Sequence, residues 1–224
     1  MALSRRELRS IHVREREQLL VSFRSLGPDA PTLCDPWRAS TLASHLVVAE
    51  QASGIGWAVG WPVRRLVGPA RSTATLRRLQ PAMQWSMARA ERRGWESLLH
   101  RLGNGPPAVF RIRNLARVRL LEDWIHHEDL RRANHLQARA RDSRIDAAVV
   151  EGLELLVAMP EFADARRHVG VRLDDGKVLN SSGSGVVVTG APGEVLLALA
   201  GRARVADVAI EGDGSSLHGD ALRF

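Results

Sequence analysis

Apolar residues recur every three or four positions over several long segments of the chain. Within residues 4–25, for example, Leu8, Ile11, Leu19 and Phe23 lie among charged residues, and this spacing predicts an amphipathic helix. The same pattern predicts further helices over residues 40–51, 72–102 and 112–134, with a kink or break in the third of these at Pro81. Glycine- and proline-rich loops separate the segments, among them residues 27–37 and 54–62. Four helices joined by loops indicate a helical bundle.

The pattern changes after residue 142. One more helix is predicted over residues 143–165, and short apolar runs then alternate with turns. The strand candidates are VGVRL, GVVVTG and VADVAIEG, with the turn DDGK after the first and the short helix GEVLLALAG before the last. We therefore predict two domains, a helical one over residues 1–140 and a small α+β one over residues 141–224, joined by a linker near 136–143.

Composition narrows the class of protein. The chain has 224 residues, of which 45% are hydrophobic and 25% charged, as in ordinary globular proteins. Its one cysteine, Cys34, excludes an intramolecular disulfide and favours the cytoplasm. Charged residues and prolines interrupt every apolar run before the roughly 18 residues that a membrane span needs, and the N-terminus lacks the pattern of a secretory signal.

The net charge of +7 raises the question of a nucleic-acid partner. All but one of the 32 basic residues are arginine, spread over many helical faces, and the chain contains no tyrosine. Proteins that bind single strands usually place aromatic residues beside a basic groove. We therefore expect no nucleic-acid partner and no membrane contact, and a monomer or homodimer.

The segment RVRLLEDWIHHEDLRRA, residues 117–133, concentrates ionisable side chains on a predicted helix. At about 100° per residue, Glu122, His126 and Asp129 share the face of the apolar positions, whereas Asp123 and His127 point to the opposite, polar side. A carboxylate on the apolar face is costly unless a positive or hydrogen-bonding group meets it. This face is therefore the candidate site.

A divalent metal ion would satisfy this requirement. Glu122 and His126 lie one turn apart and can converge on one cation, and the best third ligand is His45, which lies among apolar residues of the second helix. Two histidines and one glutamate leave a fourth position open, as in catalytic zinc sites. From the spacing alone, a structural His–Glu pair without metal remains the alternative.

Three segments carry a family resemblance: PTLCDPWRASTLASHLVVAE, EDWIHHEDLRRA and GVVVTGAPGEVLLALAGRARVADVAIEGD. Together they resemble the DinB-like mycothiol-dependent maleylpyruvate isomerase family, in particular an actinobacterial metal-binding subgroup with a His-His-Glu-Asp run. The resemblance covers nearly the whole chain. It implies a mainly α fold, with a DinB-like four-helix bundle followed by a small, sterol-carrier-like α+β domain.

The resemblance also implies an activity. It assigns His45, Glu122 and His126 to a divalent metal, usually zinc, and places the thiol of mycothiol in the open position. A metal lowers the pKa of a bound thiol, which suits isomerisation of a small electrophile through a transient adduct, or S-transfer to it. Arg202 matches the Gly-Arg motif that holds the family's catalytic arginine, although an arginine is also favoured at the end of a helix.

The chain departs from the family pattern on the substrate side. Pro36 stands before Trp37 where the family usually has glycine, and AEQASGIGW replaces a basic stretch after His45. The three tryptophans Trp37, Trp57 and Trp61 could line the pocket, but each is better interpreted as a core residue.

Four more side chains near the motifs have no assigned role from the sequence alone. Asp129 could accept the other N–H of a ligand histidine or pair with an arginine. His127 and Glu128 are expected on the polar side of the helix. Cys34 could be a fourth ligand, a nucleophile or an inert buried thiol.

Two other functions stay open at this point. In a metal-dependent hydrolase, water would occupy the open position, and Asp129 or Glu128 would act as the general base. In a non-catalytic module, the metal would only stabilise the fold and the C-terminal domain would hold an apolar small molecule. The first interpretation, an isomerase or S-transferase that uses mycothiol, is the one we carry forward.

Overall fold

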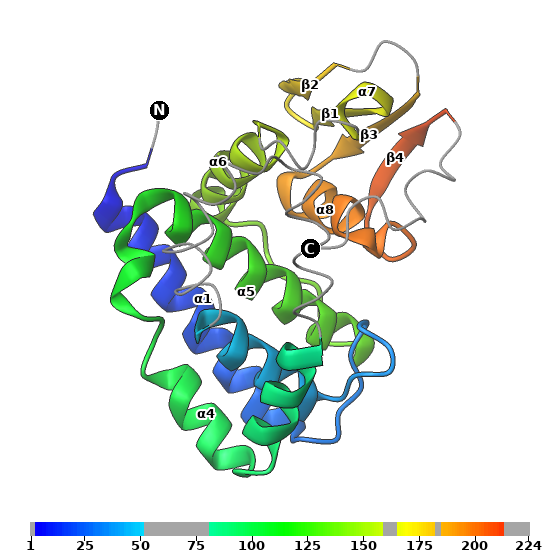
Figure 1. The fold of residues 1–224 in the computed structure, drawn as a ribbon. Helices are drawn as coiled ribbons and strands as arrows, with labels where there is room; N and C mark the ends of the chain where they lie inside the picture. Colours follow the sequence, from blue (N-terminus) through cyan, green and yellow to red (C-terminus); the bar gives the residue numbers. More distant parts are fainter. Residues whose placement is uncertain (1–2, 52–80, 159–164, 182–184, 213–224) are drawn as a thin grey trace.

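A computed structural model describes residues 3–51, 81–158, 165–181 and 185–212 (Figure 1). This part of the chain is mostly helical, with one small four-stranded sheet. The helical elements are α1 (Arg5–Leu26), helices over 39–51 and 81–91, α4 (Trp95–Gly103), a 3₁₀ turn (Ala108–Arg111), α5 (Arg113–Ala133), α6 (Ser143–Ala158), α7 (Ala165–His168), α8 (Pro192–Leu197) and a π-helical turn (Ala198–Arg202). The strands are β1 (Val169–Leu173), β2 (Val178–Asn180), β3 (Val186–Gly190) and β4 (Val208–Glu211).

Helix α1 lies close to its predicted range because residues at both of its ends favour helix termination. Ser4 and Glu7 form a capping box, in which each side chain satisfies the other residue's backbone N–H. Gly27, with a φ of +83°, ends the helix in a conformation that other residues rarely adopt. Between these ends the predicted apolar face is buried.

The helix predicted over residues 72–102 is wrong in one respect. A helix over 81–91 is separated from α4 by a break at 92–94 that was not predicted, and the residues before Pro81, where a kink or break was predicted, lie outside the described residues. Gly94 lies at this break with a φ of +91°, which a continuous α-helix does not allow. The predicted loop over 54–62, with Trp57 and Trp61, lies outside the described residues.

The sheet has the order β2-β1-β3-β4. Strands β1 and β3 are parallel, with Val171 opposite Val188, and each outer strand is antiparallel to its neighbour. Strand β2 was not predicted, because its three residues are too few to show alternation. The predicted turn DDGK is the β1–β2 connection, and Gly176 there has a φ of +87°. Helix α6 begins at the predicted residue 143 and is described as far as Ala158, and residues 159–164 of the predicted range lie outside the described residues.

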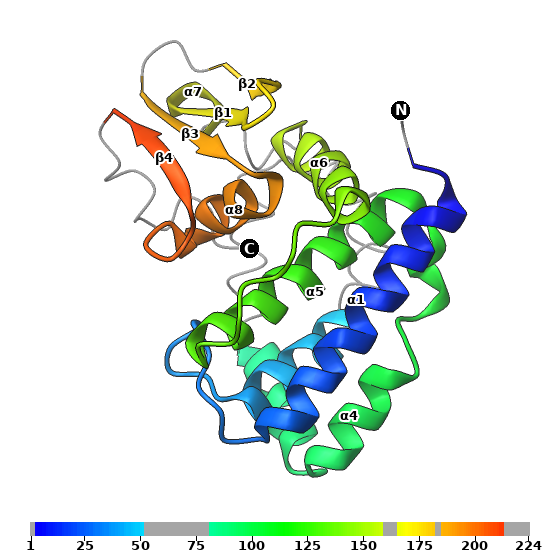
Figure 2. The same ribbon diagram turned by 180° about the vertical axis from the view of Figure 1, so that it is seen from behind.

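Helix α5 contributes to two hydrophobic cores. Leu121 and Trp124 pack into the core formed with α6, α8 and the sheet, whereas Leu130 packs into the core formed by α1, α4 and the helix over 39–51. Figures 1 and 2 show α6 and α8 between the sheet and α5. Residues 136–142, where the domain boundary was predicted, have no regular secondary structure. No described helix combines the length and apolar character that a membrane crossing requires.

Candidate metal centre

Two helices bring His45, Glu122 and His126 together. His45 Nε2 lies 3.1 Å from Glu122 Oε1, and His126 Nε2 lies 3.9 Å from the same oxygen. The two imidazole rings meet edge to face, with centroids 5.1 Å apart. One potential ligand atom from each residue lies within 4.8 Å of the others. The three residues singled out from the sequence therefore form one cluster.

The local sequence explains this arrangement. Glu122 and His126 are one turn apart on α5, so their side chains lie side by side. His45 projects from the helix over 39–51, where Leu42 and Leu46 anchor the same helix in the core. The ring of Trp37 lies 5.0 Å from the ring of His45 and limits its movement.

The cluster is only partly shielded from solvent. The side chains of His45 and His126 are 13% and 11% exposed, and that of Glu122 is 29% exposed. The cluster is therefore not completely sealed within the described residues.

The protonation states of the cluster suit a cation. Burial alone would raise the pKa of Glu122, but the hydrogen bond from His45 and the charges of His45, Arg119 and His126 lower it to about 2. Burial, together with the neighbouring His126, lowers the pKa of His45 below its usual value. At neutral pH the site therefore presents a carboxylate and an uncharged imidazole, the forms that bind metals.

A divalent ion fits this donor set. Ligand atoms around a tetrahedral zinc ion are about 3.4 Å apart, which lies between the two measured contacts to Glu122. The two imidazole nitrogens and one carboxylate oxygen are also the donor types of catalytic zinc sites.

Asp129 supports His126 from the side away from Glu122. His126 Nδ1 donates to Asp129 Oδ2 at 2.9 Å, and Arg202 donates from Nε and Nη2 to the two carboxylate oxygens at 2.9 and 2.7 Å. Burial would raise the pKa of Asp129, but these contacts hold it well below its usual range. The structure therefore brings Arg202 to the candidate site, with Asp129 between Arg202 and His126.

Cys34 also contacts this carboxylate. Its thiol donates to Asp129 Oδ2 at 3.0 Å, and Sγ lies 3.1 Å from Arg202 Nη2 and 3.9 Å from His126 Nδ1. Burial, followed by the charge of Asp129, raises the pKa of Cys34 to about 12. The sulfur faces the Nδ1 edge of His126, whereas Glu122 faces the Nε2 edge. Cys34 therefore does not complete the group formed with His45 and Glu122.

The expectation that Asp123 points to a polar, solvated face is wrong. Its side chain is fully buried and binds Arg119, together with His12 and Arg16 of α1. Burial opposes ionisation, but these partners keep the pKa of Asp123 well below its usual range. The helical wheel failed here because α1 packs against this side of α5.

The same correction applies to His127 and Glu128. His127 is 1% exposed and bridges Ser22 and Glu15 of α1, with contacts of 2.9 and 2.8 Å. Glu128 is also buried, and Arg132 donates to it at 2.8 Å. Both residues link α5 to its neighbours and lie away from the cluster around Glu122.

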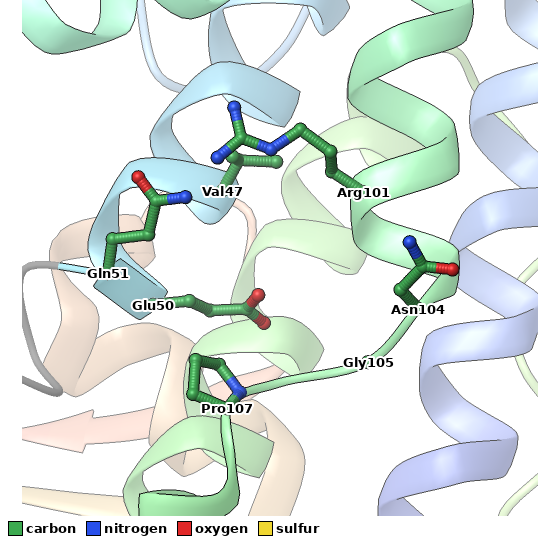
Figure 3. A pocket seen from close by; sticks show the side chains of 7 residues that line it. All are labelled: Val47, Glu50, Gln51, Arg101, Asn104, Gly105 and Pro107. Atoms are coloured by element: carbon green, nitrogen blue, oxygen red, sulfur yellow. The ribbon is translucent and has the colours of Figure 1, made fainter.

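Two buried ionisable residues near the cluster, Arg119 and Glu50, were not singled out from the sequence. Arg119 is buried, lies 3.4 Å from Glu50 Oε1 and contributes a positive charge beside Glu122. Figure 3 shows Glu50 lining a pocket that Arg101 and Asn104 also line, and none of the three candidate ligands lines it. The signal for Arg119 was present in the sequence, because Arg119 and Asp123 have the i,i+4 spacing of a helical ion pair.

Comparisons with known proteins bear on the fold. No family model and no curated protein matches the chain. Among solved structures, the chain is similar to one described as the mycothiol-dependent maleylpyruvate isomerase, with a TM-score of 0.58, 16% sequence identity and coverage of 93% of each chain. The similarity spans both the helical part and the sheet. The chain thus shares the overall fold of that isomerase.

Proposed function

We propose that the protein is a divalent-metal-dependent enzyme that uses a low-molecular-weight thiol to isomerise a small electrophile or to transfer sulfur to it. In this proposal the metal is zinc or a similar ion, the thiol is mycothiol, and the substrate resembles maleylpyruvate. The convergence of His45 on Glu122 and His126 carries the proposal. The shared fold of a mycothiol-dependent isomerase supports it.

His45, Glu122 and His126 would hold the metal, which supplies a lowered pKa to a thiol bound beside it. The protein's own residues set the charge and orientation of this site. Glu122 stays ionised at neutral pH, and Asp129 fixes the ring of His126 by accepting a hydrogen bond from its Nδ1. Such an acceptor also makes a ligand imidazole more basic.

We propose a positioning role for Arg202. Its guanidinium binds Asp129 through two hydrogen bonds, so it neutralises that carboxylate and fixes its plane. It acts on His126 through Asp129. Its side chain is 22% exposed, which leaves part of the guanidinium accessible to an anionic substrate.

The alternative of a hydrolase with Asp129 or Glu128 as general base has less support. Both oxygens of Asp129 accept hydrogen bonds from Arg202, and one also accepts from His126. Glu128 pairs with Arg132 and Arg139. The contacts of Asp129 hold its pKa well below its usual range, so this carboxylate has little affinity for a proton, and Glu128 lies away from the cluster.

Further parts of the proposal concern the organisation of the chain. We propose that residues 1–140 form a DinB-like bundle that carries the metal, and that residues 141–224 form a sterol-carrier-like domain that supplies Arg202. The two hydrogen bonds between Arg202 and Asp129 would then join the domains beside the reaction site.

Metal analysis of purified protein tests the ligand assignment. Wild-type protein should hold one tightly bound divalent ion per chain, and His45→Ala should lose it because two ligands bind far more weakly than three. His100→Ala is the matched control, since His100 is exposed on α4, and it should keep the ion. A full equivalent of tightly bound metal in His45→Ala would refute the assignment.

Thiol dependence tests the reaction class. Metal-loaded protein should convert maleylpyruvate, or a similar small electrophile, only when mycothiol is added, and His45→Ala should be inactive with it. Equal turnover without any thiol would favour the hydrolase alternative. Metal binding without turnover of any electrophile would favour the non-catalytic module.

A further inference from the structure

A second group of potential ligands lies next to the candidate centre. Cys34, His126 and Asp129 each place a ligand atom within 4.8 Å of the others, and none of these side chains is fully exposed. Cys34 comes from the loop before the helix over 39–51, and the other two residues come from α5. His126 belongs to both groups, with Nε2 toward Glu122 and Nδ1 toward Asp129.

The spacing of this second group matches a metal site. Sγ and Nδ1 are 3.9 Å apart, Sγ and Oδ2 are 3.0 Å apart, and Nδ1 and Oδ2 are 2.9 Å apart. Around a tetrahedral zinc ion with one sulfur, one nitrogen and one oxygen ligand, these separations are about 3.4 to 3.6 Å. Each atom pair therefore needs to move by about half an ångström, which side-chain rotation can supply.

We propose that Cys34, His126 and Asp129 form a second divalent-metal position, selective for thiophilic ions, which fills after the centre at His45, Glu122 and His126. Sulfur ligands favour soft ions, so zinc and cadmium suit this position and magnesium and calcium do not. The inference rests on the proposed function only in that both positions share His126.

The positively charged side chain of Arg202 lies beside Cys34 and Asp129. The guanidinium of Arg202 contacts Asp129 at 2.7 Å and Cys34 Sγ at 3.1 Å, so it supplies the positive charge that a metal would supply. Since the Arg202 side chain is 22% exposed, it can turn toward solvent without burying an unpaired charge. The incoming ion would then replace one positive charge with two.

The protons and charges of this exchange balance. When the second ion binds, the thiol proton of Cys34 and the Nδ1 proton of His126 pass to solvent. The two positions together then contain Glu122, Asp129, a thiolate and an imidazolate that bridges the two ions. These four negative charges match two divalent cations. No oxidant or reductant is required.

Cadmium titration of the metal-free, full-length protein tests the proposal. Cys34 is the only cysteine of the chain, so thiolate-to-cadmium absorption in the near ultraviolet reports on this position alone. We expect two bound equivalents by equilibrium dialysis, with the absorption growing during the second. Absence of the absorption at two bound equivalents would overturn the proposal.

Three variants separate the two positions. Cys34→Ser should bind one equivalent without the absorption. Asp129→Asn should weaken the cadmium binding that produces the absorption by about tenfold or more, because it removes a charged ligand. If its affinity is unchanged, the thiol binds cadmium alone and the proposal is wrong. His45→Ala should lose the first equivalent and keep the absorption, so failure of the proposed function would be seen separately.

A fourth variant tests whether the guanidinium of Arg202 competes with the second metal ion. Arg202→Met removes the competing cation, and we expect the second equivalent to bind about tenfold more tightly than in wild type. If Arg202 merely stabilises the fold, its loss would weaken or leave unchanged the binding of cadmium. Either of these results would overturn the exchange between guanidinium and metal.

Discussion

At the scale of single residues, the carboxylate of Asp129 links His126 of the candidate centre to two side chains outside it. It is fully buried, and its oxygens accept hydrogen bonds from His126, Arg202 and Cys34. A buried charge is tolerated only when such partners surround it. The identity of its partners could not be read from the sequence, because Cys34 and Arg202 lie far from it along the chain. The helical wheel could only place Asp129 on the same face as Glu122 and His126.

We predict that Asp129→Asn lowers metal affinity at the centre by about 10- to 100-fold, the usual cost of losing the acceptor behind a ligand histidine. The amide keeps the shape of the side chain but removes the charge that orients His126. Competition with a chelator of known affinity measures the effect. Glu154→Gln, an exposed change on α6, is the control. Unchanged metal affinity in Asp129→Asn would show that His126 is held by other contacts.

At the scale of elements, residues 126–129 show that α5 does not have one buried apolar face and one exposed polar face. His126 faces the centre, His127 binds Glu15 of α1, and Glu128 binds Arg139 in the segment after α5. Asp129 binds Arg202 at the end of the π-helical turn that follows α8. Four consecutive polar residues are buried because a different part of the chain meets each side of the helix.

The sequence therefore predicted the bounds of α5 well, but it did not predict which elements surround the helix. Residues 112–134 were expected and Arg113–Ala133 is observed, since local periodicity and chain breaks determine a helix. The pairing of Glu122 with His126 was also predictable from their spacing. The burial of Asp123 and His127 was not, because it depends on which elements pack around α5, and a helical wheel carries no such information.

Asp123 gives a pH-dependent test at this scale. We predict that Asp123→Asn lowers the free energy of unfolding by about 3 kcal/mol at pH 7, because Arg119 loses its buried partner. The folded-state pKa of Asp123 is depressed, so its stabilisation is complete above the unfolded value of about 4 and is lost as pH falls further.

The difference in stability between wild type and Asp123→Asn should accordingly be largest at neutral pH and should shrink below about pH 4. Urea unfolding of metal-free protein at several pH values measures it. A difference that stays constant down to pH 3 would mean that Asp123 is not held ionised in the folded protein.

At the scale of the whole molecule, the docking of the sheet against α5 determines whether Arg202 reaches Asp129. The fold class was predictable, because helical periodicity over most of the chain and short apolar runs near its end indicate a helical part and a small sheet. The docking was not, since it depends on packing between residues distant in sequence. Two glycines allow this close approach: Gly152 lies against Leu121, and Gly193 lies against Trp124.

Gly193→Ala tests whether this packing supports the centre. A Cβ atom at Gly193 would lie 2.6 Å from Cζ2 of Trp124, whose ring is buried and cannot turn away as a flexible side chain could. We predict that the variant loses about 1 to 3 kcal/mol of unfolding free energy. Because α8 leads directly into Arg202, displacement of α8 should also lengthen the contact with Asp129 and weaken metal retention.

The control for this prediction is Gly103→Ala, where the new Cβ would meet Leu20 at an ordinary 3.8 Å. We expect its stability and metal retention to match wild type within about 1 kcal/mol, since alanine is a good helix former. Urea unfolding and chelator competition on both variants give the comparison. If Gly193→Ala loses stability but retains metal as wild type does, the centre depends on the helices alone. Parallel losses would instead show that the sheet, through α8 and Arg202, helps to hold His126 in place.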